Sequence, residues 1–386
     1  MTRWAIASLS VAALATSPRV TISVEPAAAL VDQPVVVRVG GLHARERVLL
    51  QATTRDVAGR VWRSRVAYRA DRRGMVDTRG DMRLAWSMQR VGSRPGNADH
   101  LVLSNRSTVT VSVLRNGTTA ARASFERRTV AADVEPLELT FARDGLVGTF
   151  YRRPGSAAHT AVLALGGSAG GHSGATAALL ASRGFPTLSL GYFAEPGLPP
   201  HLQNIPLEYF QSALRRLAAQ PEVDPARIVV AGVSRGGELA LLLASYYPEL
   251  VHGAVACTTA ARVLGGDPSG RAWTIAGSPV PFEVLPVDRI AVPTLITGGG
   301  KDEIIDSGPA TEQLLELAHA HGRSNGTGHV YRDAGHGVGC AFPNLPAPGI
   351  AEPRPGTFLS LGGTLAGNGR ASAAAWPRLL RFLAAV

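Results

Sequence analysis

The feature that most constrains the fold is the stretch 229–238, in which an apolar run enters Gly-x-Ser-x-Gly and a helical pattern follows at once. A serine can act as a nucleophile when its Oγ is presented at the tip of a sharp strand-to-helix turn. Such a turn strains the backbone and brings strand and helix so close that only glycine fits at the flanking positions. The helix starting at Arg235 also points N–H groups at an oxyanion forming beside Ser234. The pattern predicts a nucleophile elbow at Ser234; the alternative is a glycine-rich turn with an incidental serine.

The sequence pattern of the first third of the chain is typical of β-strands. Short runs rich in β-branched and apolar residues are separated by turn signals such as Arg115-Asn116-Gly117. Strands are predicted at 20–24, 35–39, 48–53, 60–68, 108–114 and 121–126, with 71–105 as a long irregular connection. Regularly spaced strands with no convincing helix favour an all-β, immunoglobulin-like sandwich domain over residues 20–138.

After Pro136 strand patterns alternate with helical patterns. Strands are predicted at 161–165, 186–190, 228–232, 253–257, 294–298 and 329–331, and helices at 174–183, 207–220, 236–247, 309–321 and 372–385. This alternation favours a doubly wound, mostly parallel sheet with helices on both faces, placed at residues 139–386. Residues 265–282, rich in glycine, serine and proline, are interpreted as an insertion that covers the pocket.

A nucleophilic serine needs a base, and the base needs an acid that orients it. In the α/β-hydrolase architecture they follow in the order serine, acid, histidine, each after a later strand. Asp302 lies in a glycine-rich turn after one predicted strand, and His336 lies between glycines after another. Glu303 and Asp306 compete with Asp302, which the position directly after the turn favours. These residues predict a Ser234, Asp302 and His336 triad.

An oxyanion hole requires two convergent N–H groups. The first is expected from Arg235, the residue after the nucleophile, and the second from the loop 166–171, at Gly167 and Ser168. The same glycine-rich loop is also compatible with phosphate binding, but it lacks the Walker lysine-serine ending and the spacing of a dinucleotide fingerprint. The sequence therefore predicts an oxyanion loop and no cofactor.

The remaining histidines and the two cysteines predict no metal site. His319 and His321 lie on a predicted helix and face different directions, whereas His172 and His201 fall near the pocket but outside the triad order. Cys257 and Cys340 are too few for a disulfide framework, and whether they pair stays open.

The positive charge of the chain is concentrated in its first part. Residues 1–145 hold 22 arginines against 13 acidic residues, a net of +9, out of +10 for the whole chain. The arginines fall singly along alternating strands, and neither a zinc spacing nor a helix-turn-helix pattern accompanies them, which argues against nucleic acid as a partner. A solvated basic face is favoured over attraction of an anionic substrate.

The N-terminus bears on the cellular compartment. Residues 4–15 form a mildly apolar run after Arg3 and end in Ala13-Leu14-Ala15, the form of a short signal peptide; the alternative is an untargeted extension within residues 1–19. A signal peptide would imply secretion, and an extension the cytoplasm. No later stretch is long and apolar enough to span a membrane.

With the triad placed, the chain resembles the acyl-CoA thioesterases grouped with the bile acid-CoA:amino acid N-acyltransferases. The resemblance runs from Val20 to the C-terminus. It rests on the segments 24–26, 39–42, 68–71, 84–88, 207–210, 232–238 and 334–336, and on the 34 residues from Asp302 to His336. The hydrolase motifs are shared by many esterases, but their pairing with this sandwich domain is far more specific.

The resemblance implies hydrolysis of a fatty acyl-CoA to free acid and CoA, with Ser234 as nucleophile, His336 as base and Asp302 as orienting acid. Members that conjugate amino acids carry cysteine at the position of Ser234, so the serine favours hydrolysis. Three alternatives remain: a secreted serine esterase on the same scaffold, an acyltransferase with an amino acid acceptor, and a binding protein with an idle triad. Acyl chain length and oligomeric state stay open.

Overall fold

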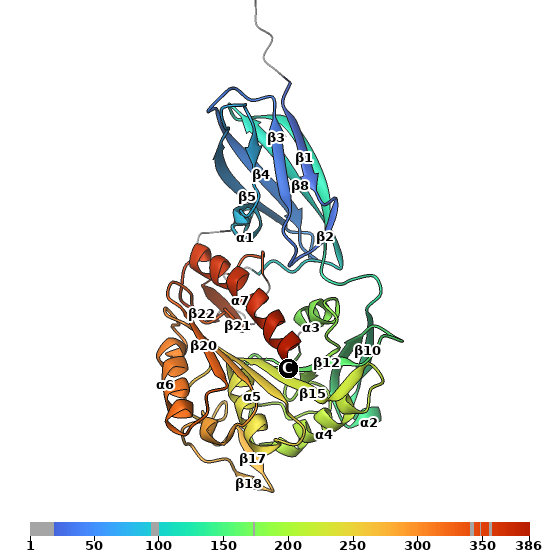
Figure 1. Ribbon diagram of the computed structural model, residues 1–386, viewed down its shortest axis with the longest axis vertical. Helices are drawn as coiled ribbons and strands as arrows, with labels where there is room; N and C mark the ends of the chain where they lie inside the picture. The colour runs from blue at the N-terminus through green and yellow to red at the C-terminus, as the bar shows by residue number, and fades with distance from the viewer. Residues whose placement is uncertain (1–18, 94–99, 173, 340–342, 348, 355–356) are drawn as a thin grey trace, which may run out of the picture.

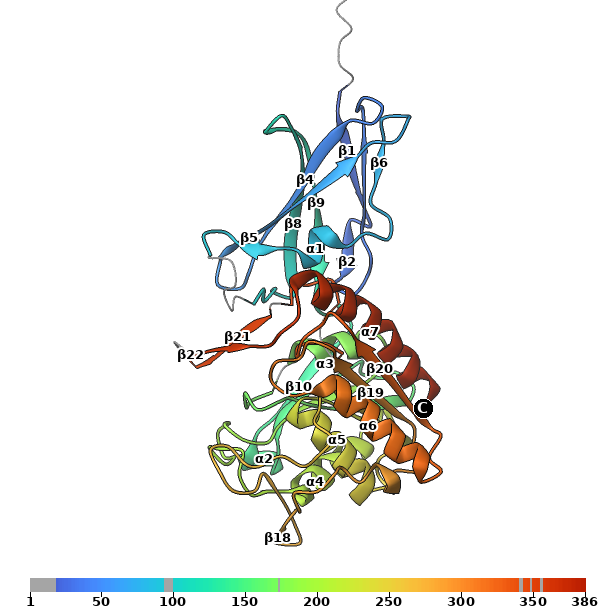
Figure 2. The same ribbon diagram turned by 90° about the vertical axis from the view of Figure 1, so that its left-hand side faces the viewer.

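The structure is a computed structural model that describes residues 19–93, 100–172, 174–339, 343–347, 349–354 and 357–386. Two bodies are stacked along the long axis, as Figure 1 shows. Strands β1 to β9 form the upper, N-terminal body, and the elements from β10 to α7 form the lower, C-terminal body. Helix α7 (Leu365–Ala385) lies at the junction, where its first turns approach the short helix α1 (Arg83–Trp86), as Figure 2 shows from the side.

The N-terminal body consists of two sheets. One has the strand order β2-β9-β8-β4-β5-β7 and the other β1-β3-β6. Their bounds are β1 Thr21–Glu25, β2 Ala28–Leu30, β3 Val36–Gly40, β4 Arg47–Arg55, β5 Val61–Arg69, β6 Val76–Asp77, β7 Gln89–Arg90, β8 Arg106–Arg115 and β9 Thr118–Arg128. Alternate residues of β4 and β8 are buried, as expected of strands with one face on a core, and the two sheets enclose one apolar cluster around Leu50, Trp62 and Val111.

All six strands predicted in this body are present to within a few residues. The connection 71–105 is more ordered than predicted, since it contains β6, α1 and β7. These elements have two to four residues, too short for a periodic pattern to show in sequence.

The C-terminal body is built on an eight-stranded sheet of order β10-β11-β13-β12-β15-β16-β19-β20. The last six strands of that order run parallel, whereas β11 is antiparallel to both its neighbours. The bounds are β10 Glu135–Leu139, β11 Val147–Arg152, β12 His159–Leu165, β13 Thr187–Gly191, β15 Val223–Val233, β16 Gly253–Cys257, β19 Thr294–Gly299 and β20 Gly326–Tyr331. The predicted mostly parallel sheet is therefore confirmed, and β10 and β11 extend it beyond the predicted strands.

Helices cover both faces of this sheet. Apolar residues of α4 (Leu207–Ala218), α5 (Arg235–Tyr246) and α6 (Ser307–Ala320) share one core, and those of α3 (Gly174–Ala181) and α7 share another. Strand β10 crosses the predicted domain division at residues 138 and 139, because it pairs with β11 inside the large sheet.

Short elements complete the C-terminal body. These are α2 (Phe141–Asp144), the strands β14 (Ile205–Pro206), β17 (Trp273–Ile275) and β18 (Ser278–Pro279) of a small sheet, a 3-10 turn at Val287–Arg289, and the pair β21 (Ile350–Arg354) and β22 (Thr357–Ser360). The predicted insertion 265–282 thus contains β17 and β18, and the small sheet ties it to the start of α4.

The two bodies are joined through Asp32, in the loop after β2. Its side chain is 2% exposed and accepts two hydrogen bonds of 2.6 Å from Arg183 and one of 2.9 Å from the Trp376 indole on α7. The neighbouring Val31 is fully buried in the core beneath α7. Polar and apolar contacts together fix the N-terminal body on α3 and α7.

We expect Asp32→Ala to lower the free energy of unfolding by about 3 kcal/mol, because it leaves the Arg183 charge and the indole N–H without their buried acceptor. Urea unfolding followed by tryptophan fluorescence measures the change. Asp133→Ala is the matched control: its carboxylate also pairs with an arginine, Arg153, but is 64% exposed, so the loss should stay below about 1 kcal/mol. Equal losses in the two variants would contradict this view of the junction.

Candidate active site

Ser234 stands between β15 and α5 in a backbone conformation that side chains rarely adopt. Its φ is +57° and its ψ −117°, and it forms the N-cap of α5. Its N–H donates to the Cys257 carbonyl at the end of β16, while its own carbonyl accepts from the N–H groups of Gly237 and Glu238. A strained residue held by neighbours on both sides is what the predicted elbow requires.

Glycine is required at two positions of the motif because neighbouring backbone segments approach them too closely for a side chain. A Cβ on Gly232 would lie 2.1 Å from the Gly236 carbonyl oxygen. A Cβ on Gly236 would lie 2.5 Å from the carbonyl oxygens of Leu165 and Gly166, at the end of β12. Strand β15, helix α5 and strand β12 therefore meet with no room for a side chain, and this packing holds the turn closed.

Asp302 and His336 are in direct contact. The His336 Nδ1 lies 2.8 Å from the Asp302 Oδ2, and the carboxylate is fully buried. Asp302 also accepts from the Ser307 hydroxyl at 2.5 Å and from the N–H groups of Ile304 and Ile305. Burial by itself would raise the pKa of Asp302, but the hydrogen bonds from His336 and Ser307 outweigh it and hold this pKa below its usual range. A carboxylate only accepts, so Nδ1 carries a proton and Nε2 of the neutral ring is left as acceptor.

The loop that carries His336 folds back toward the elbow. Its Gly339 lies so close to the end of β16 that an added Cβ would meet the Cys257 Cβ at 3.1 Å. The Cys257 carbonyl in turn holds the Ser234 N–H. Ser234 and His336 thus belong to loops that meet at the end of β16, with exposed fractions of only 8% and 9%.

Residues that the sequence did not single out hold the His336 loop. Asn368, buried in the first turn of α7, accepts from the Gly335 N–H at 2.9 Å, and the His336 N–H donates to the Leu361 carbonyl. No local pattern marks these contacts, since the partners are about 30 positions apart in the chain. Helix α7 therefore connects the junction of the two bodies to the candidate base.

The predicted oxyanion loop lies beside Ser234. A Cβ on Gly167 would approach the Ser234 Cβ to 3.2 Å and its Oγ to 3.7 Å, whereas Ser168 is exposed. The hydroxyl of Tyr192, a buried residue just after β13, donates to the Gly166 carbonyl at 2.7 Å and so supports the loop from below. Arg235 is the first residue of α5, and its N–H has no acceptor within the helix.

The side chain of Arg235 belongs to a buried charge cluster beneath the elbow. It lies 3.4 Å from Glu238, one turn along α5, and donates to the Leu264 carbonyl. Glu238 accepts from the Trp273 indole at 2.6 Å and from the Leu264 N–H at 3.3 Å. Burial raises the pKa of Glu238 to about 7 and lowers the pKa of Arg235. This cluster fastens the predicted insertion to the first turn of α5.

A second histidine and carboxylate pair lies beside the end of β13. His172 Nδ1 is 2.8 Å from Glu195, and its Nε2 is 3.1 Å from the Thr149 hydroxyl, which donates to Glu138. Both ring nitrogens are thereby engaged in the polar chain that crosses the edge of the sheet. His172 is thus paired with residues outside the predicted triad, and His201 is exposed.

The remaining predictions concern metals, membranes and the termini. His321 is the C-cap of α6, bonded to the Leu317 carbonyl, and among the described residues no cluster of three or more candidate ligands could hold a metal ion. None of the helices in the described part combines the length and apolar character that crossing a bilayer requires. Residues 1–15 and Cys340 lie outside the described residues, so the choice between a signal peptide and an extension, and whether Cys257 and Cys340 pair, stay open.

Comparison with known proteins decides the family. The family model described as "Acyl-CoA thioester hydrolase/BAAT N-terminal region" matches residues 32–141. A second family model, described as "BAAT / Acyl-CoA thioester hydrolase C terminal", matches residues 205–269 and 274–385. Acyl-coenzyme A thioesterase 1 of Rattus norvegicus is 30% identical over 317 residues, which cover 76% of this chain and 72% of the relative.

The chain belongs to the family of acyl-CoA thioesterases and bile acid-CoA amino acid N-acyltransferases. The resemblance stated from sequence is thus confirmed. Other members match over almost their whole length. Acyl-coenzyme A thioesterase 6 of Mus musculus is 28% identical, and the match covers 94% of this chain and 96% of the relative. Acyl-coenzyme A amino acid N-acyltransferase 1 of Mus musculus is 26% identical, and the match covers 92% of this chain and 95% of the relative.

Solved structures match more remotely. An esterase from Pyrobaculum calidifontis has a TM-score of 0.45 and 19% sequence identity, covering 66% of this chain and 87% of the esterase. The C-terminal body has the sheet of the α/β-hydrolase fold, eight strands that run mostly parallel with an antiparallel second strand, β11.

Glu238 predicts a pH dependence of stability. Its folded pKa of about 7 exceeds the ordinary value of 4.5, so the native carboxyl keeps a proton that the unfolded chain has released. The contribution of Glu238 to stability therefore falls as pH rises from 4.5 to 7. Relative to Glu238→Gln, the wild type should lose about 3 kcal/mol of unfolding free energy across this window.

Urea unfolding of both proteins at a series of pH values measures this difference. Glu312→Gln, on the exposed face of α6, is the control and should leave the wild-type pH dependence unchanged. Parallel curves for the wild type and Glu238→Gln would show that the buried carboxyl does not titrate in this range.

Proposed function

We propose that this protein hydrolyses fatty acyl-CoA thioesters to free acid and CoA through an acyl-enzyme intermediate on Ser234. The observation that carries the proposal is the positive φ of Ser234 at the carboxyl end of β15, at the same sheet edge as a histidine that a buried carboxylate holds by Nδ1. The family membership supports acyl-CoA as the substrate class, since its named members are acyl-coenzyme A thioesterases and N-acyltransferases.

In the proposed acylation step, the Ser234 Oγ attacks the thioester carbonyl and its proton passes to His336 Nε2. Asp302 keeps the ring in the required tautomer and stabilises the imidazolium that forms. The oxyanion of the tetrahedral intermediate accepts from the Arg235 N–H and from an N–H of Gly167 or Ser168. Collapse breaks the carbon–sulfur bond, and the CoA sulfur leaves with the proton from His336.

Deacylation reverses these roles with water as the nucleophile. His336 Nε2 takes a proton from the attacking water, and Ser234 recovers a proton when the ester bond breaks. No cofactor is needed, because the side chains supply both the nucleophile and the proton transfer. We infer that the N-terminal body is an immunoglobulin-like sandwich domain and that the C-terminal body alone carries the catalytic residues.

A second candidate is transfer of the acyl group to an amino acid, which is favoured by the similarity to N-acyltransferase 1 of Mus musculus. The two candidates share acylation and differ in whether water or an amine attacks the acyl-enzyme. An acyl-serine is an oxyester, which is less reactive toward amines than the thioester that a cysteine would form. Ser234 therefore favours hydrolysis.

The test is steady-state release of CoA from acyl-CoAs of graded chain length. We expect Ser234→Ala to lower kcat/KM by about 10³-fold or more, because the nucleophile is lost while the fold is kept. Ser212→Ala, which removes an exposed hydroxyl on α4, is the control and should stay within about twofold of the wild type.

Other outcomes separate the alternatives. Formation of an N-acyl amino acid when glycine or taurine is added would favour the transferase, and comparable turnover of simple acyl esters would favour an esterase. CoA release that persists in Ser234→Ala would overturn the proposed mechanism.

A further inference from the structure

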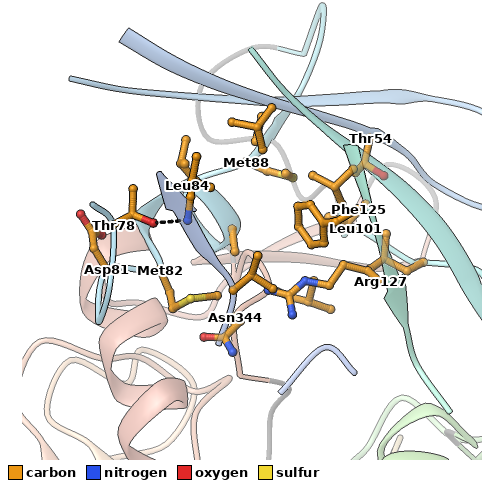
Figure 3. A pocket seen from close by; sticks show the side chains of 18 residues that line it. Thr54, Thr78, Asp81, Met82, Leu84, Met88, Leu101, Phe125, Arg127 and Asn344 are labelled. Atoms are coloured by element: carbon orange, nitrogen blue, oxygen red, sulfur yellow. Dashed lines mark hydrogen bonds between the residues drawn. The ribbon is translucent and has the colours of Figure 1, made fainter. Parts of the chain in front are cut away.

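The N-terminal body contains an open cavity between its two sheets, at the end that faces the C-terminal body (Figure 3). Its walls come from β3, β4, β8, β9 and α1, and Asn344 and Leu345 of the C-terminal body close one side. Apolar side chains make up most of the lining, including Val37, Leu84, Met88, Val111 and Phe125. None of the residues proposed for catalysis lines it.

Arg127, on β9, brings a buried positive charge to this cavity. It is 4% exposed, and its guanidinium lies 5.4 Å from the centre of the Phe125 ring. Figure 3 shows the side chain extending from its strand toward Asn344. Desolvation lowers its pKa to about 10, which still leaves it charged at neutral pH.

The hydrogen-bonding capacity of this guanidinium is only partly used. Nη1 donates to the carbonyls of Leu30 and Gln33, at 3.0 and 2.8 Å. Among the described residues, no protein acceptor is bonded to its Nε or Nη2. Asp32, the carboxylate that acts on Arg127 through space, is bound instead to Arg183 and Trp376. Nε and Nη2 keep contact with the open cavity, so three of the five N–H donors face it without a protein partner.

A ligand carboxylate that accepts from these donors would replace water there, and a hydrogen bond to a charged group contributes more than one between neutral groups. The Nε and Nη2 side of a guanidinium presents two parallel N–H groups, and a carboxylate fits them with two parallel hydrogen bonds. The apolar walls next to it exclude a wholly polar anion but suit a hydrocarbon chain.

The other charged group of the lining sets the orientation. Asp81 lies on the side of the cavity away from Arg127 (Figure 3), where it is already paired with Arg83 and accepts from the Tyr68 hydroxyl at 3.0 Å. A carboxylate placed there would be repelled, whereas the Arg127 end attracts it. The cavity therefore has one end for an anionic head and an apolar body for a tail.

We propose that this cavity is a binding site for a medium-chain aliphatic carboxylate, held by Nε and Nη2 of Arg127 with its chain against Leu84, Met88 and Val111. The site is separate from the proposed catalytic residues and does not depend on Ser234 being a nucleophile. The site binds a ligand that has both a carboxylate and an alkyl chain, so a short polar acid or an uncharged alcohol should bind weakly.

Photolabelling of the full-length protein tests this site directly. The probe is an octanoate analogue with a diazirine at the end of its chain. Trypsin cleaves after Arg83 and Arg90, so Leu84, Ala85 and Met88 are recovered in one peptide, 84–90. We expect the label on this peptide, suppressed by excess octanoate and not by octanol or acetate.

Two variants remove the site in different ways. Arg127→Met takes away the donors for the head and should lower labelling of peptide 84–90 by at least about tenfold. Ala85→Phe places a ring in the cavity, leaves Arg127 and its two carbonyl partners intact, and should have the same effect. Arg128→Met is the control, because this neighbouring arginine of β9 is paired with Glu126 and does not line the cavity.

The proposal is overturned if the label falls on neither peptide 84–90 nor peptide 107–115, which carries Val111, or if octanol competes as well as octanoate. Labelling that is unchanged in Ala85→Phe would overturn it too, even if Arg127→Met failed to fold. CoA release by the same variants reports the proposed function separately, because a thioesterase without this carboxylate site still releases CoA.

Discussion

The strained backbone of Ser234 is the constraint on which the rest of the site depends. A residue with φ of +57° persists only where its surroundings over-determine it, and here β12, β15, β16 and α5 all contribute. Gly232 and Gly236 let strand and helix approach, and the Cys257 carbonyl holds the Ser234 N–H. The same packing that creates the strain leaves the first N–H of α5 free beside the serine. The parallel strands and α5 therefore hold Ser234 in its strained conformation.

Two buried carboxyl groups at this edge have opposite environments. Asp302 accepts from His336, Ser307 and two backbone N–H groups, which keeps it ionised in spite of burial. Glu238 is also buried and accepts from the Trp273 indole and the Leu264 N–H, but desolvation outweighs these bonds and the Arg235 charge and raises the pKa of Glu238 to about 7. The ionised group can stabilise an imidazolium, and the other one fastens the insertion to α5. Environment, rather than residue type, separates the two roles.

The sequence was a good guide wherever the chemistry is local. Gly-x-Ser-x-Gly located the elbow, and the alternation of apolar residues located most strands. In the two sheets of the N-terminal body and the eight-stranded sheet it missed β2, β6, β7, β10 and β11, of two to six residues, whose pairing depends on partners elsewhere in the chain. It favoured Asp302 over Glu303 and Asp306, and the hydrogen bond to His336 agrees with that choice. The Glu238 and Trp273 contact, like the Asp32 anchor, joins residues far apart in sequence, and a single sequence carries no periodic signal for such pairs.

The most direct test of the proposed mechanism is mass spectrometry of the protein quenched in acid during turnover of a long-chain acyl-CoA. Trypsin cleaves after Arg227 and Arg235, so peptide 228–235 contains Ser234 as its one hydroxyl nucleophile. The mechanism predicts that this peptide gains the mass of the acyl group less one hydrogen, and that the adduct accumulates when deacylation is slowed. Steady CoA release with no acyl adduct on this peptide, or with the adduct on another residue, would contradict the assignment of Ser234.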